Sequence, residues 1–375
     1  MSKISSAGIS ILILLILISG ANAIAVENIK KIDVSKTNFW DVVLSPDGTQ
    51  IAFVAIDEKF TQQIFVINSD GTNEKKITLD ENKKWGLAWG KDKIAYNSFG
   101  KDGLEKIFVI NPDGTGNAQL ILDNTRQGNA FSDKPPAWAA PSWSPDGKSL
   151  VYTSLDEKSN QKIYQVSADG TGKRQVFDDT FRQWSPAFSP DGKNIVYVSY
   201  SPEKYKEELF IVDIAGTARK QLTFDEIKKN YPVWGSDGTI VFVSYESVTS
   251  SGEKLFAISQ DGTNRRLFIN TDYRQQSPSF SRDGRKFAYA AIDVSGNIKI
   301  AVGDVTGITA ATTTITTATP IITTAAPTIA KSTVTPAATV QTQEEEGNGI
   351  WFIMVLAAAV MLLLVAIALK EYFKK

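Results

Sequence analysis

Apolar and polar residues alternate along most of the chain in short runs, which is the pattern of β-strands with one face toward a core. Typical runs are "IAFVAI" from Ile51, "QIFVI" from Gln63, "KIFVI" from Lys106 and "IVYVSY" from Ile195. Turn-forming residues, above all Asp-Gly, separate the runs. The pattern therefore predicts an all-β domain.

One short phrase recurs between these runs at an even spacing. It reads "LSPDGTQIAF" from Leu44, "WSPDGKSLVY" from Trp143, "FSPDGKNIVY" from Phe188 and "FSRDGRKFAY" from Phe280. The aspartates that mark all copies of the phrase are Asp47, Asp92, Asp146, Asp191, Asp237 and Asp283, with steps of 45, 54, 45, 46 and 46 residues. A period of about 40–50 residues is typical of a β-propeller, in which each repeat is one four-stranded blade.

Each repeat contains four predicted strands. The first is short and ends in a large apolar residue: Leu44, Trp89, Trp143, Phe188, Trp234 or Phe280. The phrase itself fits a type I turn followed by a left-handed glycine. The second and third strands are apolar, a "DGT" turn follows, and the fourth strand is more polar, as in "KKIT" from Lys75. We expect a six-bladed β-propeller of four-stranded antiparallel blades.

The repeated aspartates have two interpretations, as turn residues or as metal ligands. Backbone geometry alone explains an Asp beside a Gly in a hairpin turn. Two copies of the phrase, "WGKDKIAY" and "WGSDGTIVF", are shorter than the others. A hairpin tolerates such changes and a metal loop does not, so the sequence favours the turn, and no metal site or cofactor is predicted.

The last repeat has no fourth strand of its own, because "NIKIAV" from Asn297 leads into a different kind of sequence. The segment "NIKKIDVS" from Asn28 looks like a fourth strand and stands before the first repeat. We therefore expect the N-terminal strand to complete the last blade, which would close the ring and remove an open sheet edge.

The two ends of the chain differ from the propeller, predicted over residues 24–307. Residues 1–23 combine an apolar run with Ala21-Asn22-Ala23, the pattern of a cleaved secretory signal peptide, with an uncleaved anchor as the alternative. Residues 308–349 are rich in Thr, Ala and Pro, which is typical of an extended and often O-glycosylated stalk. Residues 350–369 carry no charge and are long enough to cross a bilayer as a helix.

Lysines in the tail, residues 370–375, set the predicted orientation. Cytoplasmic segments next to a membrane helix carry an excess of Lys and Arg. The tail is therefore expected in the cytoplasm and the propeller outside, as in a single-pass protein of the cell membrane. The predicted C-terminal transmembrane helix makes the membrane one expected partner.

Composition limits the chemistry. The 375 residues include no Cys and no His, so disulfides are impossible and imidazole-dependent nucleophilic catalysis is excluded. The 40 basic and 41 acidic residues nearly balance. A nucleic-acid partner would need a basic face, and none is indicated.

The "SPDG" and "DGT" phrases, repeated in phase, resemble those of the WD-like propellers of TolB-type proteins and of prolyl oligopeptidase relatives. The resemblance covers about residues 28–307. It implies a propeller that binds envelope partners, although TolB-type proteins have an additional N-terminal α/β domain and the oligopeptidases a hydrolase domain, and this chain shows neither. The stalk and the lack of Cys also resemble cell-surface proteins of archaea.

Function is predicted from the loops. The first hypothesis is a non-catalytic cell-surface binding or scaffold module for an envelope or extracellular protein or glycan. The alternatives are a carbohydrate-active enzyme, a lyase or glycosidase with Asp, Glu, Tyr or Lys as acid and base, and an architectural part of a surface layer.

The loops from each fourth strand to the next first strand open at one end of the channel and combine aromatic and basic residues. Such side chains suit sugar rings and peptide segments. The predicted ligand-binding residues are Trp40, Trp85, Trp138, Arg182, Trp184, Tyr231 and Arg274, with no catalytic residue assigned. The same tryptophans would also suit a core between blades, and both interpretations are open at this point.

Overall fold

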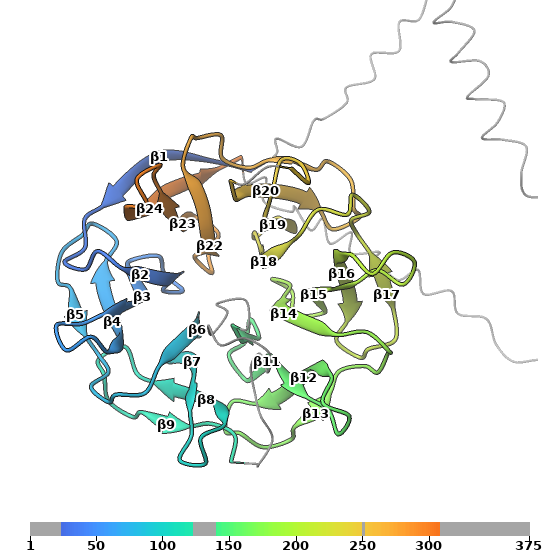
Figure 1. Ribbon diagram of the computed structural model, residues 1–375, viewed down its shortest axis with the longest axis horizontal. Helices are drawn as coiled ribbons and strands as arrows, with labels where there is room; N and C mark the ends of the chain where they lie inside the picture. The colour runs from blue at the N-terminus through green and yellow to red at the C-terminus, as the bar shows by residue number, and fades with distance from the viewer. Residues whose placement is uncertain (1–23, 123–139, 250–251, 308–375) are drawn as a thin grey trace, which may run out of the picture. The chain divides into compact units, whose positions relative to one another are not determined.

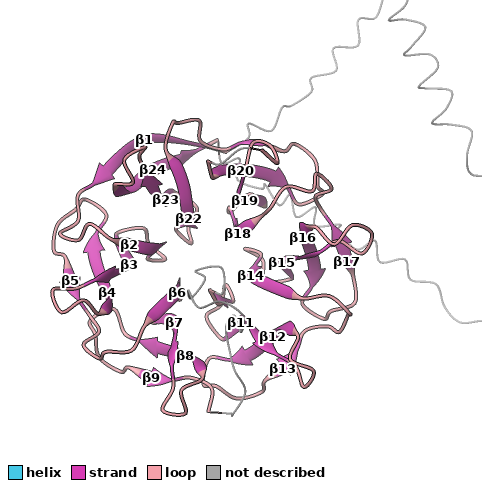
Figure 2. Ribbon diagram, in the orientation of Figure 1, coloured by secondary structure: helices cyan, strands magenta, loops and turns pink. Residues whose placement is uncertain are grey.

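Six four-stranded antiparallel sheets surround a central axis in the computed structural model (Figure 1). The structure describes residues 24–122, 140–249 and 252–307. Within these residues every regular element is a strand (Figure 2). The predicted six-bladed propeller is therefore confirmed, and each blade is an open sheet whose first strand lies nearest the axis.

The first three blades follow one another along the chain, each from its innermost strand outward. Blade 1 contains β2 (Phe39–Leu44), β3 (Gln50–Ile56), β4 (Gln62–Asn68) and β5 (Lys75–Lys76). Blade 2 contains β6 (Lys84–Trp89), β7 (Ile94–Phe99), β8 (Glu105–Ile110) and β9 (Ala118–Gln119). Blade 3 contains β10 (Ser142–Trp143), β11 (Ser149–Leu155), β12 (Gln161–Ser167) and β13 (Arg174–Gln175).

The last three blades repeat this order, and the sixth takes its outer strand from the N-terminus. Blade 4 contains β14 (Gln183–Phe188), β15 (Asn194–Tyr200), β16 (Glu207–Asp213) and β17 (Arg219–Gln221). Blade 5 contains β18 (Asn230–Trp234), β19 (Thr239–Ser244), β20 (Lys254–Ser259) and β21 (Arg266–Leu267). Blade 6 contains β22 (Arg274–Phe280), β23 (Lys286–Ile292), β24 (Ile298–Thr306) and β1 (Ala25–Ile32).

The pairing of β1 with β24 confirms the expected role of the N-terminal strand (Figure 1). The two strands are antiparallel, with Ala25 opposite Thr306 and Ile32 opposite Ile300. The strand begins three residues earlier than the sequence pattern indicated. A bulge between Glu27 and Lys30 interrupts the register.

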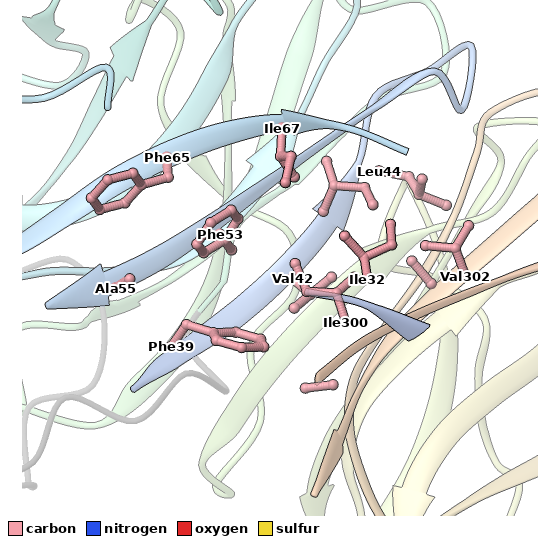
Figure 3. Close-up of a cluster of buried hydrophobic side chains, with 13 residues drawn as sticks. Ile32, Phe39, Val42, Leu44, Phe53, Ala55, Phe65, Ile67, Ile300 and Val302 are labelled. Atoms are coloured by element: carbon pink, nitrogen blue, oxygen red, sulfur yellow. The ribbon is translucent and has the colours of Figure 1, made fainter. Parts of the chain in front are cut away.

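Hydrophobic side chains fill the spaces between neighbouring blades. The described core separates into six clusters, and each joins two adjacent blades. Figure 3 shows the cluster between blades 6 and 1, where Ile32 of β1 and Ile300 of β24 pack with Phe39 and Phe53 of blade 1. The N-terminal strand therefore contributes both a sheet edge and apolar contacts to the closure of the ring.

The repeated phrase forms the expected hairpin turn. In blade 1 the amide of Gly48 donates to the carbonyl of Ser45 at 2.9 Å, and Gly48 has φ of 70°. Asp47 accepts hydrogen bonds from the Ser45 hydroxyl at 2.6 Å and from the Thr49 amide at 3.0 Å. The Ser45 and Thr49 donors hold the pKa of Asp47 below its usual range. These contacts account for the Asp in the phrase, because every one serves the turn.

Strand direction alternates within a blade and gives the propeller two unlike faces. The turns after the first and third strands share one face, here called the turn face; for example, the Ser69 amide donates to the carbonyl of Thr49 at 2.8 Å. The loops after the second and fourth strands share the opposite face, here called the loop face. Because β1 begins opposite the end of β24, both ends of the described chain lie on the turn face.

Buried polar side chains hold the loops that lead to the channel. Lys162, at the start of β12, is 1 % exposed in its side chain and donates to the carbonyl of Phe181 at 3.1 Å and to Asp179 at 3.2 Å. Gln63 of β4 donates to the carbonyl of Asp80 at 2.7 Å. A buried ammonium group is tolerated only when it is paired in this way.

The predicted signal peptide (1–23), stalk (308–349), membrane helix (350–369) and tail (370–375) lie outside the described residues. Over the residues that are described, no helix is long and apolar enough to span a bilayer.

Removing residues 24–32 is expected to lower the unfolding temperature of the protein by many degrees, because β24 loses its pairing partner and the cluster between blades 6 and 1 loses Ile32. Differential scanning calorimetry measures the change. Lys30→Ala is the matched control, since Lys30 lies in β1 outside the core clusters. An unchanged midpoint after the deletion would show that β1 does not hold the ring.

Candidate functional site: the central channel

A β-bulge with a left-handed residue recurs in the innermost strand of five blades. The register shifts after Trp40, Trp85, Trp184, Asn230 and Gln276. The next residue in each case has positive φ: Asp41 (55°), Gly86 (64°), Ser185 (50°), Tyr231 (52°) and Ser277 (50°). Four of these are not glycine, and such backbone costs roughly 1–3 kcal/mol each. Bulges re-aim side chains, and here they shape the wall of the channel.

A cavity of about 450 Å³ occupies the axis between the bulges and the turn face. All six innermost strands contribute to its wall. Aromatic rings from Trp89, Trp143, Phe188, Trp234 and Phe280 are combined with the prolines and serines that follow the bulges and begin the turns. The wall is thus apolar and hydroxyl-rich, a surface suited to ligands that present flat apolar faces and hydrogen-bonding edges.

Two tryptophans of the wall are fixed by hydrogen bonds to the neighbouring blade. The indole Nε1 of Trp143 donates to the carbonyl of Ala88 at 3.2 Å. The indole of Trp234 donates to the carbonyl of Ala187 at 3.1 Å. Each bond holds its ring against the neighbouring blade.

Three ionisable residues line this cavity among the described residues: Asp41, Tyr231 and Arg282. Asp41 is 4 % exposed and accepts a hydrogen bond from the Gly86 amide at 2.7 Å. Burial raises the pKa of Asp41 to about 7, and the Gly86 amide opposes part of that rise. Burial, with Asp41 and Glu253 nearby, raises the pKa of Tyr231 well above its usual range.

Two of the predicted site residues lie in the core. Trp85 is fully buried, with its ring centroid 5.3 Å from that of Phe99. Trp184 is 7 % exposed, packs 5.2 Å from Tyr200 and belongs to the cluster between blades 4 and 5. For these two residues the core interpretation holds, because their rings cannot reach a ligand without unpacking the blades.

Four of the other five predicted residues are spread over the loop face and the channel. Tyr231 lines the cavity, and Trp40 is half-buried beside the cluster between blades 1 and 2. Arg182 and Arg274 are exposed, and Arg274 forms an ion pair with Glu253 at 2.9 Å. Trp138 lies outside the described residues. Ligand binding by these five residues stays a prediction.

Sequence reasoning missed most of the cavity wall. It treated the phrase as a turn alone, whereas Pro46, Pro145 and Pro190 of the phrase line the cavity. A second repeated pattern was available, since "APSW", "SPAF", "YPVW" and "SPSF" each precede a turn. In "SPAF", "YPVW" and "SPSF" the pattern marks the bulge. In all four copies it includes the last residues of the innermost strand, which line the cavity.

Exposed apolar side chains gather on the loop face. The large hydrophobic residues that are most exposed in the described part of the chain are Phe60, Leu79, Leu122, Tyr205, Phe224, Val248 and Val294. Every one lies in a loop after a second or fourth strand, and Val294 and Phe60 are 97 % and 91 % exposed. Such side chains, concentrated on one face, are typical of surfaces that contact other macromolecules.

The acidic side chains of the described residues offer little support for a metal-binding site. No group of three or more acidic side chains placed to hold a metal ion occurs in residues 24–122, 140–249 and 252–307. Hard divalent cations need several oxygen ligands, and Asp41 is the only carboxylate among the residues that line the cavity.

Comparison of sequences identifies one family. The family model described as the TolB beta propeller domain matches residues 21–235, more than half of the chain. No curated protein matches the chain significantly in sequence.

Comparison of structures finds similar propellers. A putative TolB from Agrobacterium tumefaciens has a TM-score of 0.53 at 16 % identity, over 72 % of this chain and 90 % of that one. TolB from Acinetobacter baumannii has a TM-score of 0.51 at 19 % identity, and the match covers 72 % of this chain and 65 % of the Acinetobacter chain. Oligogalacturonate lyase in complex with manganese has a TM-score of 0.50 at 13 % identity, and the match covers 73 % of this chain and 78 % of the lyase chain. At these identities the likeness concerns the fold alone.

Replacing Trp184 by Ala is expected to cost about 3–5 kcal/mol of stability, because the change leaves a cavity between blades 4 and 5. Arg182→Ala is the control, since this exposed side chain lies two residues away and surface substitutions usually change stability by about 0.5 kcal/mol or less. Urea unfolding of both variants measures the difference. Equal stability of the two would mean that Trp184 is not a core residue.

Proposed function

Because the chain belongs to the family of TolB β-propeller domains, we propose that it is a non-catalytic binding module that holds part of its ligand in the central channel. The proposed ligand is an envelope or extracellular protein or a glycan. The observation that carries the proposal is the cavity at the axis, to which all six blades contribute. A site to which every blade contributes exists only when the ring is complete, as expected when the whole propeller serves one binding function.

The chemistry of the cavity favours binding over catalysis. Hydrolysis of a glycosidic bond generally requires two carboxyl groups on opposite sides of the bond. The residues that line the cavity include one carboxylate, Asp41, together with the phenol of Tyr231 and the guanidinium of Arg282. Rigid aromatic rings and hydroxyl groups supply affinity and orientation without a reacting pair. The likeness to a lyase in fold adds no catalytic residue to this cavity.

The loop face supports a macromolecular ligand. Its exposed Phe, Leu, Tyr and Val side chains would lose their contact with water when a partner covers them, and burial of apolar surface drives association. Both ends of the described chain lie on the turn face, so neither of these two ends covers the loop face. The ligand would then contact this face or enter the channel from it.

Replacing Trp89 by Ala is expected to weaken capture of the natural ligand by about 2 kcal/mol or more, because Trp89 is a half-buried ring of the cavity wall. Capture from an envelope extract and binding to a glycan panel, both with the full-length protein, measure the effect.

The comparison variant is Trp40→Ala, another half-buried tryptophan of an innermost strand, which does not line the cavity and stays a predicted ligand-binding residue. If the Trp40 variant loses capture and the Trp89 variant keeps it, the ligand binds at the loop-face mouth, and the cavity is not the site. Thermal unfolding of both variants shows whether either loss comes from unfolding.

We also propose that the propeller lies outside the cell, tethered through the stalk and the membrane helix predicted from the sequence. The lysines after residue 369 and the predicted signal peptide support this orientation. Protease added to intact cells is expected to release a fragment of about propeller size by cleavage between residues 308 and 349. A propeller that stays protected until the cells are lysed would contradict the proposed topology.

A further inference from the structure

We propose that Asp41 binds the cationic end of a ligand, a primary ammonium or guanidinium group, inside the channel cavity. The inference rests on the proposed function, since it names the chemistry that the channel would recognise. It assigns to one carboxylate a role that neither the repeat nor the turns require.

The position of Asp41 carries the inference. The residue is held at φ of 55° in the bulge of β2, and its side chain crosses from blade 1 to the Gly86 amide of blade 2. That bond uses one oxygen, Oδ2. The other oxygen, Oδ1, is not among the buried side-chain atoms that lack a partner, so it is open to the cavity that Asp41 lines, although the residue as a whole is only 4 % exposed. A carboxylate that is mostly removed from water is stabilised by a positive charge that reaches its open side.

The cavity that Asp41 lines suits an organic cation. The indole rings of Trp89, Trp143 and Trp234 line the same cavity, and aromatic faces attract ammonium and guanidinium groups. A single carboxylate in a cavity with aromatic walls is a poor ligand set for a metal ion, which requires several oxygen ligands. It is a good one for a cation whose alkyl stem also gains apolar contact.

The other charged groups near Asp41 do not replace such a ligand. Arg282 is exposed at the turn face, where its backbone amide donates to the carbonyl of Pro46 at 2.9 Å. Tyr231 is a phenol whose pKa is raised by burial, Asp41 and Glu253, so it stays neutral through the physiological range. Arginine stays protonated throughout. Asp41 is thus the one cavity residue of the described chain that changes charge near neutral pH.

Binding of a cation should therefore depend on pH. Burial raises the pKa of Asp41 to about 7, and a cation binds only the ionised form. Affinity is expected to rise with pH across that value, by about tenfold between pH 6 and pH 8, because the ionised fraction rises by that factor. Affinity for a cation rises with pH because the cation is attracted to ionised Asp41. A ligand that prefers neutral Asp41 would instead bind more weakly as pH rises.

The experiment uses the full-length protein with N-acetyl-lysine amide and N-acetyl-arginine amide as probes, and N-acetyl-norleucine amide as the uncharged control. Isothermal titration calorimetry at pH 6 and pH 8 is expected to show about tenfold tighter binding of both cationic probes at pH 8. Asp41→Asn is expected to abolish the gain. Asp47→Asn makes the same change in an exposed turn outside the cavity, and this variant is expected to keep the tighter binding of the cationic probes at pH 8.

Three results would overturn the inference: norleucine amide binding as tightly as the cations, affinity that does not change with pH, or Asp41→Asn binding like the unaltered protein. The pH dependence of the unaltered protein tests the inference even if the Asp41 variant fails to fold. If Trp89→Ala loses the natural ligand while Asp41→Asn retains it, the cation site is wrong and the binding channel stands. If lysine amide binds through Asp41 but Trp89→Ala captures normally, the proposed function fails instead.

Discussion

The packing of each blade against its two neighbours is the interaction on which the rest of the structure depends. A four-stranded sheet has two faces, and the innermost three strands are apolar on both, so a lone blade would leave both faces in water. The six clusters cover these faces in pairs around the ring. The clusters form a closed circle, and β1 and Ile32 contribute to the contact between the first and last blades.

Closure of the ring also creates the channel. The innermost strands cannot approach the axis closely, since six sheets with their side chains must fit around it. The bulges turn the residues after them toward the axis, and these residues, with the turns, surround the cavity. Asp41, Ser185, Tyr231 and Ser277 adopt backbone that favours glycine. These residues keep positive φ against their own conformational preference, because the surrounding blades determine the backbone there.

Charged residues divide into two kinds in this propeller. Most buried ones hold loops, as Lys162 does with Asp179 and Lys229 with Glu208 at 2.6 Å. In each of these a buried charge is matched by an opposite charge, so the cost of removing it from water is met locally. Asp41 differs, because an amide is its only described partner and its environment favours the neutral form. This difference is the reason that a ligand is proposed for Asp41 and not for Lys162 or Lys229.

The sequence by itself determined the propeller, the number of blades, the ends of the innermost strands at Leu44, Trp89, Trp143, Phe188, Trp234 and Phe280, and the pairing of the N-terminal strand with the last blade. These features follow from local rules of strand alternation and turn geometry, repeated with a fixed period. The location of the cavity did not follow, because residues far apart in the chain meet only when the ring closes. Whether Trp184 packs in the core and Asp41 faces the axis depends on the neighbouring blade and on a bulge. Tertiary structure decided both, since burial is a property of the assembled ring and not of a single repeat.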